Sequence, residues 1–395
     1  MNGEGPGRYE HRLFILNRYG TGEVFSMKVS AMRTTILDHR ITKRQIWEKI
    51  KNITDFEAVV LDNCLYILGG YDNIGKEHLN RVICYNPELD SWDIRAPMLN
   101  SRSKFSAAAV QDTIVVSGGE KIPGKSTAAA EIYVPKTDTW LRTGMLPEPR
   151  HNHAAAVING ALYTSGGKCN DQPEDNIWIF DKLARVTWQD LDEDYPQYLN
   201  KPIYKHCMVT VKRRLYFIGG IRYKYYQDGR KECISLDTIQ SFQPYVPLRE
   251  VLDKTRPPPA LPDEPKDRDG QPPSDDDDEE RPLQADIISP WEFNEGILPM
   301  KHARHSAGAI ALGHRIYVFG GSCLGTNDDI RHVEFYDTEK RSWHEAFTIK
   351  KGDLHNVVCL FLKIPVIPQS ERAFELKVEN AEKSNMLQPG KWIMW

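Results

Sequence analysis

The 395-residue sequence lacks long apolar runs, closely spaced cysteine pairs and any large net charge. Its longest apolar stretch, near Val357–Leu362, is far too short to cross a bilayer. The seven cysteines are odd in number and scattered, with no Cys-x-x-Cys pair, which indicates the reduced thiols of an intracellular protein. The N-terminus also lacks the apolar core of a signal peptide. We therefore expect a protein of the cytoplasm, or of the nucleus, without a membrane partner.

Motifs for catalysis or cofactor binding are missing as well: we find no nucleophile elbow, phosphate-cradling glycine loop or metal-ligand spacing. The nearest metal-like pairs are His151 with His153 and His302 with His305. Residues i and i+2 of a strand share a face, so the first pair could converge, but polar residues at a loop-to-strand junction explain it as well. We expect a non-catalytic protein with no cofactor and no metal site.

The charge that exists is local. The net charge of −4 gives no case for nucleic-acid binding. Most of this charge lies in residues 254–281, which carry ten acidic and five basic side chains. This segment belongs to a Pro- and Asp-rich stretch over 246–288, which has too little apolar surface to offset its ordering entropy. We expect a disordered acidic insertion there. A tolerated loop is the simpler interpretation, and a second binding site or a regulatory tail is the alternative.

What the sequence does contain is a repeat of about fifty residues. A short apolar run ends on two glycines at Gly69, Gly118, Gly166, Gly219 and Gly320. An aromatic residue and, seven or eight positions later, a tryptophan follow in four of the copies. The pairs are Tyr85 with Trp92, Tyr133 with Trp140, Phe180 with Trp188 and Tyr336 with Trp343. Apolar alternation before a glycine pair predicts a half-buried strand, and this period is typical of a four-stranded propeller blade.

These residues resemble the Kelch repeat, and the resemblance covers roughly residues 11–363. It implies an all-β protein: a six-bladed Kelch β-propeller with four antiparallel strands per blade, whose first blade is closed by the C-terminal strand at 356–363. Trp47 and Trp291 are taken as the closing tryptophans of the first and fifth blades. The predicted blades cover 11–50 with 355–363, 54–95, 103–143, 151–190, 204–293 and 304–346. A tail over 1–10 and a tail over 364–395 flank them.

Blade geometry places two sets of residues at one mouth of the central channel. Residues just after each glycine pair and residues just before each first strand lie on the same face of an antiparallel meander. The second set follows an arginine in three repeats, at Arg102, Arg150 and Arg304. The predicted partner-binding residues are Asp55, Tyr71, Asn73, Ser103, Lys104, His151, Asn152, Lys168, Asn170, Tyr204, Lys205, Arg222, Tyr223, His305, Ser306 and Ser322. The mixture of cations and aromatic rings suits an extended peptide that carries carboxylates.

The mouth resembles the surface from which Kelch domains of the Kelch-like (BTB–Kelch) family contact peptide partners. That resemblance implies the substrate-binding domain of an adaptor for a cullin-RING E3 ubiquitin ligase. In that family a BTB domain binds the cullin, and this sequence contains none, so a cullin would be a partner only through a BTB domain outside this chain. The alternative is a free-standing Kelch scaffold or a protein that binds actin or another cytoskeletal filament. A Kelch-fold enzyme is the third hypothesis.

Overall fold

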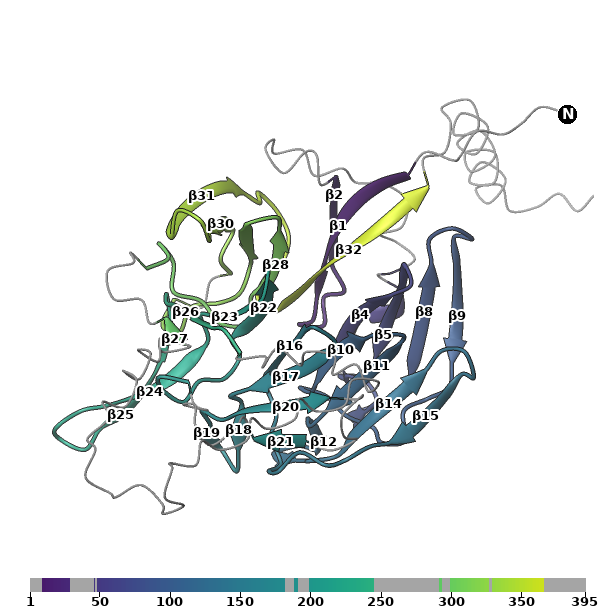
Figure 1. Cartoon of the computed structure of the whole chain (residues 1–395), viewed down its shortest axis with the longest axis horizontal. Coiled ribbons are helices and arrows are strands. Elements are labelled where there is room, and N and C mark those ends of the chain that lie inside the picture. The colour runs from purple at the N-terminus through teal and green to yellow at the C-terminus, as the bar shows by residue number, and fades with distance from the viewer. Residues whose placement is uncertain are drawn as a thin grey trace, which may run out of the picture.

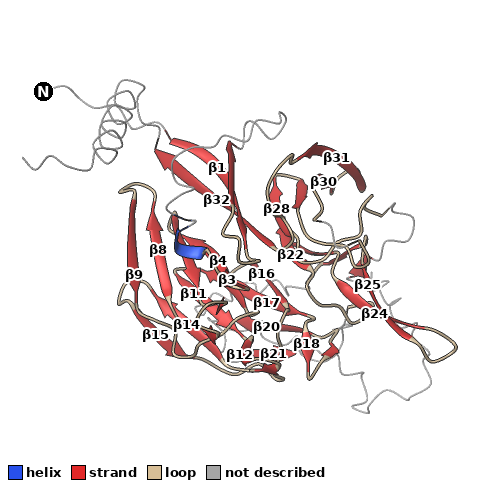
Figure 2. Cartoon of the chain, turned by 180° about the vertical axis from the view of Figure 1, so that it is seen from behind, coloured by secondary structure: helices blue, strands red, loops and turns tan. Residues whose placement is uncertain are grey.

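The computed structural model describes residues 9–28, 46, 48–181, 188–190, 199–244, 291–292, 299–326 and 329–365. Antiparallel β-sheet dominates these residues, and the helical ones are 46 and 48–50 (Figure 2). Five sheets have four strands each, and a sixth, of order β2-β1-β32, has three. Neither the acidic insertion predicted over 246–288 nor the tail after residue 365 lies within the described residues.

Strands at equivalent places in the sheets are similar in length. The first strands are β4 (Glu57–Leu61), β10 (Ser106–Val110), β16 (Ala154–Ile158), β22 (Cys207–Val211), β28 (Gly308–Leu312) and β32 (Val357–Pro365). The second strands are β5 (Cys64–Leu68), β11 (Thr113–Ser117), β17 (Ala161–Ser165), β23 (Arg214–Ile218), β29 (Arg315–Phe319) and β1 (Tyr9–Asn17). The third strands are β8 (Val82–Asn86), β14 (Ala130–Val134), β20 (Ile177–Asp181), β26 (Ile239–Phe242), β30 (His332–Asp337) and β2 (Val24–Lys28).

The outermost strands and the short hairpins complete the pattern. The fourth strands are β9 (Ser91–Arg95), β15 (Thr139–Arg142), β21 (Trp188–Asp190), β27 (Trp291–Glu292) and β31 (Ser342–Thr348). Between second and third strands lie β6 (Tyr71–Asp72) with β7 (Glu77–His78), β12 (Glu120–Ile122) with β13 (Lys125–Ser126), β18 (Lys168–Cys169) with β19 (Gln172–Pro173), and β24 (Ile221–Tyr225) with β25 (Lys231–Ser235). The remaining strand, β3 (Ile53–Thr54), pairs with β6.

The sheets are arranged as the blades of a propeller. Their first strands contact one another in the cyclic order β4, β10, β16, β22, β28 and β32, and β32 contacts β4 again. Figure 1 shows the sheets following one another in chain order around the molecule, with β1 and β32 beside β4. The predicted all-β Kelch-type propeller is therefore confirmed. The count of six blades stays a prediction, because the fourth strand expected in the first blade falls outside the described residues.

Both ends of the described chain build the first blade. Strand β32 pairs antiparallel with β1 from Tyr9↔Pro365 to Asn17↔Val357, and β1 pairs with β2. Apolar side chains of these strands, Leu13, Phe14, Ile15 and Leu362 among them, are at most 1% exposed. Closure by the C-terminal strand is thus as predicted. The pairing extends two residues beyond each predicted end of the domain, since β1 begins before residue 11 and β32 ends after residue 363.

In the first blade, the spacing assigns Trp47 to a fourth strand. Trp47 lies outside the described residues, so this assignment stays a prediction, and the residues beside it at 46 and 48–50 are helical. Ile46 and Ile50 are fully buried and pack against β1, β4 and β32. Spacing alone could not distinguish a strand from a short helix that buries the same apolar residues.

The aromatic–tryptophan pairs lie where the repeat predicts. In each of four blades the aromatic residue of the third strand is directly opposite the tryptophan of the fourth, with ring centroids 5.0–5.3 Å apart. Phe242 is opposite Trp291 in the fifth blade, although a long stretch of sequence separates them. Tyr133 is fully buried and Trp140 is 6% exposed. These pairs contribute to the apolar layers between successive blades.

The glycine pairs are required by the next blade. Gly119 has φ of +95°, and a Cβ there would lie 2.6 Å from the carbonyl oxygen of Ser103. Its N–H donates to the carbonyl oxygen of Arg150, which belongs to the following blade, at 2.8 Å. Any larger side chain would clash with backbone and distort this link.

The arginines of the repeat are also structural. Arg102, Arg150 and Arg304 are at most 1% exposed. Each guanidinium donates to the carbonyl oxygen of the first glycine in its own blade, at 2.8, 2.9 and 3.1 Å. Arg102 also pairs with the buried carboxylate of Glu131 at 2.5 Å. Because removing one partner of such a pair leaves an uncompensated charge, these arginines are fixed by folding rather than by binding.

A chain that ends at residue 351 lacks β32, and we expect it to lose cooperative folding. The truncation exposes one edge of β1 together with the apolar surfaces of β4 and β28. Size-exclusion chromatography and thermal melting measure the outcome. The matched control ends at residue 365 and keeps β32. A monomeric truncated protein with the melting temperature of the control would contradict the closure.

Replacing Trp140 by alanine should lower the free energy of unfolding by about 3–5 kcal/mol, the usual range for a large buried side chain. The indole is buried and its Nε1 donates to the carbonyl oxygen of Ala96 at 2.8 Å. Trp92 occupies the equivalent position in the preceding blade but is only half-buried, so Trp92→Ala should cost less. Urea unfolding of both variants checks this. Equal losses of unfolding free energy would contradict the expectation that the more buried tryptophan contributes more.

Candidate partner-binding site at the channel mouth

Five equivalent residues stand immediately before or near the start of the first strands and share one unusual backbone conformation. Asp55, Lys104, Asn152, Lys205 and Ser306 have φ between 51° and 56°. This left-handed region is unfavourable for most residues other than glycine, asparagine and aspartate. Its recurrence in five blades shows that the architecture, rather than any one sequence, imposes it. All five side chains line the same cavity in the central channel.

A belt of backbone hydrogen bonds explains the conformation. Each N–H of these residues donates to the carbonyl oxygen of the equivalent residue in the preceding blade. The bonds run from Asp55 to Arg18, Lys104 to Asp55, Asn152 to Lys104, Lys205 to Asn152, Ser306 to Lys205 and Val357 to Ser306, and the bond from Arg18 to Asn356 completes the belt. Their lengths are 2.7–3.1 Å. The belt occupies the backbone and leaves the side chains as the variable lining of the channel.

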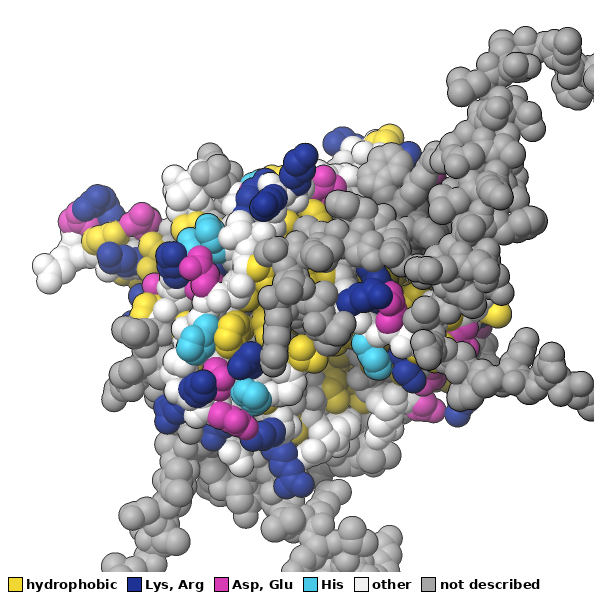
Figure 3. Space-filling view, turned by 90° about the horizontal axis from the view of Figure 1, so that it is seen from above, with side chains coloured by type: hydrophobic (Ala, Val, Ile, Leu, Met, Phe, Trp, Pro, Cys, Tyr) yellow, Lys and Arg dark blue, Asp and Glu magenta, His cyan; other side chains and the backbone are white. Residues whose placement is uncertain are grey.

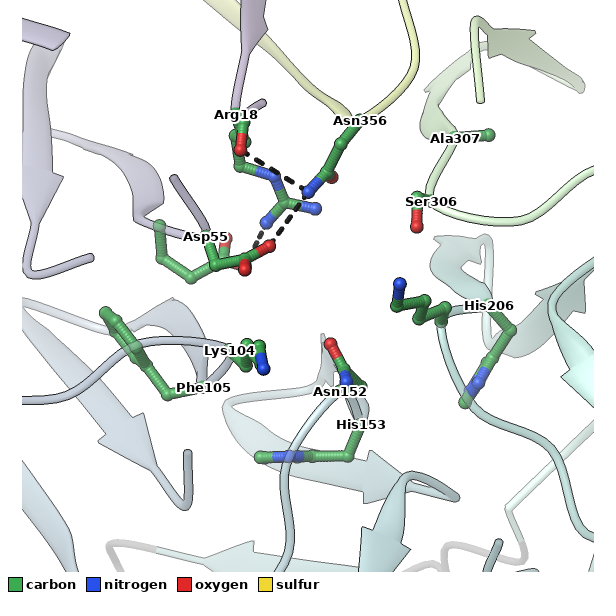
Figure 4. A pocket seen from close by; sticks show the side chains of 12 residues that line it. Arg18, Asp55, Lys104, Phe105, Asn152, His153, His206, Ser306, Ala307 and Asn356 are labelled. Carbon is green, nitrogen blue, oxygen red and sulfur yellow. Dashed lines mark hydrogen bonds and ion pairs between the residues drawn. The ribbon is translucent and has the colours of Figure 1, made fainter. Parts of the chain in front are cut away.

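The cavity at this level has a volume of about 60 Å³. Figure 4 shows Asn152, Ser306 and Asn356 around it, with Asp55 accepting a hydrogen bond from Asn356. Arg18 pairs with Glu57, and the ammonium of Lys104 lies 2.9 Å from the carboxylate of Glu120. Burial raises the pKa of Glu57, and Arg18 partly offsets this effect. Two of the three cations that line the cavity are thus neutralised within the protein.

Lys205 is the exception. Among the described residues, no carboxylate oxygen lies within 4.0 Å of its ammonium. Burial lowers the pKa of Lys205; Asp55 opposes this, whereas Lys104 lowers it further. A poorly solvated cation without a paired anion is costly, and an incoming carboxylate would relieve that cost. Of the three cations that line this cavity, Lys205 is thus the one without a paired carboxylate among the described residues.

A wider hollow of about 390 Å³ adjoins the cavity. The predicted residues Asn73, His305 and Ser322 line it together with Asp55, Lys205 and Ser306. Thr54 lines it too, and so do four residues that the sequence reasoning missed, from the first blade and the segment before β32: Arg18, Tyr19, His355 and Asn356. The first blade has no glycine pair to mark its second strand, so only the alignment of Asn17 with the other strand ends could have revealed them.

Several predicted residues connect blades instead of lining the channel. Ser103, His151 and Tyr204 are at most 6% exposed and form backbone bridges with the strand that follows the glycine pair. The Nδ1 of His151 is 2.7 Å from the hydroxyl of Ser126 in the preceding blade. His305 does both: its Nδ1 lies 3.0 Å from the hydroxyl of Ser235, and its 8% exposed side chain borders the wider hollow. These residues offer backbone positioning more than accessible side chains.

The remaining predicted residues lie toward the rim. Tyr71 packs against His78 with ring centroids 5.1 Å apart, and Asn170 is exposed. The ammonium of Lys168 lies 4.6 Å above the ring of Tyr204. Arg222 and Tyr223 do not reach the channel cavity and line a separate hollow beside β24. The predicted set is therefore divided between the channel, the blade interfaces and a second surface.

The histidine pairs considered as metal ligands are bonded within the protein. The Nε2 of His153 contacts the hydroxyl groups of Ser106 and Ser117, at 2.8 and 3.2 Å. Within the described residues, one group of three has ligand atoms within 4.8 Å of one another: Asp329, Asp353 and His355. Asp329 there pairs with Arg331 and accepts from the N–H of Leu354, so we assign no metal to this group. No helix in the described residues has the length and apolar character needed to cross a membrane.

One face of the described part of the molecule carries charged side chains of both signs. On the face drawn in Figure 3, basic, acidic and histidine side chains are interspersed between apolar ones.

Comparison with known families agrees with the fold. Residues 55–241 match the KLHDC2/KLHL20/DRC7 Kelch-repeats domain, and residues 303–346 match the Kelch motif. Both stretches of the chain therefore contain Kelch repeats. These matches support a protein-interaction module, and the resemblance stated from the sequence is confirmed.

Similar proteins carry Kelch names. Kelch-like protein 26 of Danio rerio is 24% identical over 315 residues, covering 77% of this chain and 42% of that protein. Kelch-like protein 23 of Homo sapiens is 23% identical over 337 residues, covering 82% and 49%. Kelch repeat and BTB domain-containing protein 12 of Homo sapiens is 29% identical over 172 residues, covering 38% and 28%. The chain spans less than half the length of each of these three relatives.

Buried histidines should make the fold sensitive to acid. Burial lowers the pKa of His206 to about 3, and burial together with Lys205 lowers the pKa of His305 to about 4. An unfolded histidine has a pKa near 6.5. Between the two values the unfolded chain binds more protons, so stability is lost as the pH falls below about 6.5, by up to about 1.4 kcal/mol per pH unit for each histidine.

His206→Asn should flatten this dependence by about one histidine, measured as the free energy of urea unfolding between pH 7.5 and 5. The variant also loses the contact between His206 and Ser165. That loss lowers the free energy of unfolding equally at every pH, so it does not contribute to the change in pH dependence. The control is His314→Asn, since the His314 side chain is 40% exposed. An unchanged slope in His206→Asn would contradict the assignment.

Proposed function

We propose that this chain recognises a segment of a partner protein at the channel mouth, and that an acidic side chain of the partner pairs with Lys205. The supporting observation is that the ammonium of Lys205 has no paired carboxylate among the described residues. Lys205 is half-buried, and no described carboxylate lies within 4.0 Å of it. The amide of Asn152 and the hydroxyl of Ser306 line the same cavity and supply hydrogen-bonding groups beside it. A carboxylate bound here would accept charge-assisted hydrogen bonds in a poorly solvated site.

We further propose that the partner is the substrate of a cullin-RING E3 ubiquitin ligase, in the cytoplasm or the nucleus, and that the chain acts as the Kelch domain of a BTB–Kelch adaptor. The similarity to Kelch-like proteins and to a protein named for both Kelch repeats and a BTB domain supports this role. The cullin would be bound by a BTB domain outside this chain. Sequencing the native transcript upstream of Met1 tests the proposal, because an adaptor requires an encoded BTB domain there.

Lys205→Met should abolish partner capture without destabilising the fold. The substitution removes a cation that has no paired anion, and methionine is similar in length to the aliphatic part of lysine. The free energy of unfolding should therefore stay equal or rise. Proximity labelling with the full chain measures capture, and a melting curve measures stability. Binding by the unsubstituted protein should also weaken with added salt if the contact is ionic.

The matched control is Lys212→Met. Lys212 also has a left-handed backbone, with φ of 56°, but its side chain is 74% exposed on the turn between β22 and β23. Lys212→Met therefore makes the same substitution at a residue with the same backbone conformation, on a surface away from the channel. If both variants capture the same proteins as the unsubstituted chain, the channel does not hold the partner.

A further inference from the structure

The hairpin β24–β25 differs from its counterparts in the other blades. Its two strands have five residues each, whereas β6, β7, β12, β13, β18 and β19 have two or three. It extends away from the body of the propeller in both Figure 1 and Figure 2. Five cross-strand pairs, from Ile221↔Ser235 to Tyr225↔Lys231, hold it together. The hairpin therefore carries a strand edge that the shorter hairpins lack.

Hydrogen bonding shows which backbone groups of β24 face away from β25. The N–H of Tyr226 donates to Arg230 inside the hairpin. Ile221 exchanges both of its backbone hydrogen bonds with Tyr204 on the other side, at 2.8 and 3.0 Å. Because the direction alternates along a strand, Tyr223 and Tyr225 also point their N–H and C=O groups to the side of Tyr204. Among the described residues no backbone group pairs with either of them on that side.

A proline ends the pairing at this edge. If the register of Tyr204↔Ile221 continued, Pro202 would stand opposite Tyr223. Proline has no N–H to donate, so it cannot continue an antiparallel ladder. A hollow of about 430 Å³ lies here instead, bounded by Pro202, by Gln172 and Pro173 of the neighbouring blade, and by residues 222–225 of β24. The open edge and the hollow coincide.

The hollow is cationic. Lys201, Arg222 and Lys224 line it, together with Tyr223 and Tyr225, and no acidic residue does. The Nε of Arg222 is buried without a hydrogen-bond partner in the described structure. Residues 222 and 224 project to the same face of the strand, since side chains alternate with a period of two. Lys201 and Arg222 also line an adjoining hollow of about 370 Å³.

We propose that the free edge of β24 binds an extended acidic segment of another protein, which adds to the hairpin as a third strand. Backbone hydrogen bonds to Tyr223 and Tyr225 hold the segment, as in other cases of strand addition. Carboxylates at alternate positions pair with Arg222 and Lys224, which fixes the register. This surface lies outside the channel and goes beyond the recognition proposed for Lys205.

The probe is a fluorescent eight-residue peptide in which threonine and glutamate alternate, and its affinity for the full chain is measured by fluorescence anisotropy. Arg222→Gln with Lys224→Gln should weaken binding at least tenfold. Tyr225→Pro should also weaken it, because it removes an outward N–H without breaking the pairing of β24 with β25. Tyr225→Phe is the matched control and should bind normally. Lys212→Met, whose side chain is exposed on the turn between β22 and β23, should bind normally too. Lys205→Met tests only partner capture at the channel, so failure of this proposal is distinguishable from failure there.

Methylation of the peptide backbone tests the strand geometry directly. Peptides N-methylated at every second residue are made in both phases, and only the phase that blocks the bonds to β24 should lose binding. Equal effects of the two phases, or unchanged affinity in the glutamine variant when its melting curve is intact, would overturn strand addition. Binding that appears only after deletion of residues 255–283 would assign the edge to the chain's own acidic segment. A dimer that Tyr225→Pro dissociates in sedimentation would assign it to a second copy. Both outcomes overturn the proposal of an external partner.

Discussion

The closed belt of backbone hydrogen bonds around the channel is the constraint on which the rest of the structure depends. It links Asp55, Lys104, Asn152, Lys205 and Ser306 to one another and to the first blade through Arg18 and Val357. In the five blades that contain a glycine pair, the belt residue has left-handed φ although these residues are as different as lysine and serine. The N–H of the second glycine links each of five blades to the next one, and the three buried arginines tie the glycine carbonyl within their own blades. Repetition in the sequence is the consequence of this geometry.

The same constraint separates conserved geometry from variable chemistry within the molecule. Gly119 and Arg102 have no freedom, because each contacts backbone of the blade next to it or of its own sheet. The left-handed positions are bound through their N–H and C=O groups, so their side chains can differ from blade to blade without loss of the belt. Partner specificity can therefore reside in the side chains of the belt residues. The residues that are identical from repeat to repeat hold the fold together instead.

The repeat in the sequence was sufficient to predict the sheets, the pairing of Tyr133 with Trp140, closure by the C-terminal strand and the placement of five residues in the channel. It failed where the repeat itself fails. Arg18 and Asn356 belong to a blade without a glycine pair, so the repeat did not mark them. Spacing also could not show that His151 and Tyr204 are buried between blades, because their backbone positions match those of accessible residues.

The blade made of β22, β23, β26 and β27 concentrates the departures from the pattern. It carries Lys205, the long hairpin β24–β25, and Ile203 at the position where three other blades have arginine. Ile203 keeps the backbone link, since its carbonyl oxygen still accepts from Gly167 at 2.9 Å. A guanidinium that would tie the glycine carbonyl to the third strand, as Arg102 does in its own blade, is absent at this position. This blade keeps the backbone hydrogen bonds to its neighbour, and with Ile203 in place of arginine it lacks the side-chain bonds to the glycine carbonyl within the blade. Both candidate recognition surfaces, the cation in the channel and the open edge of β24, are built from it.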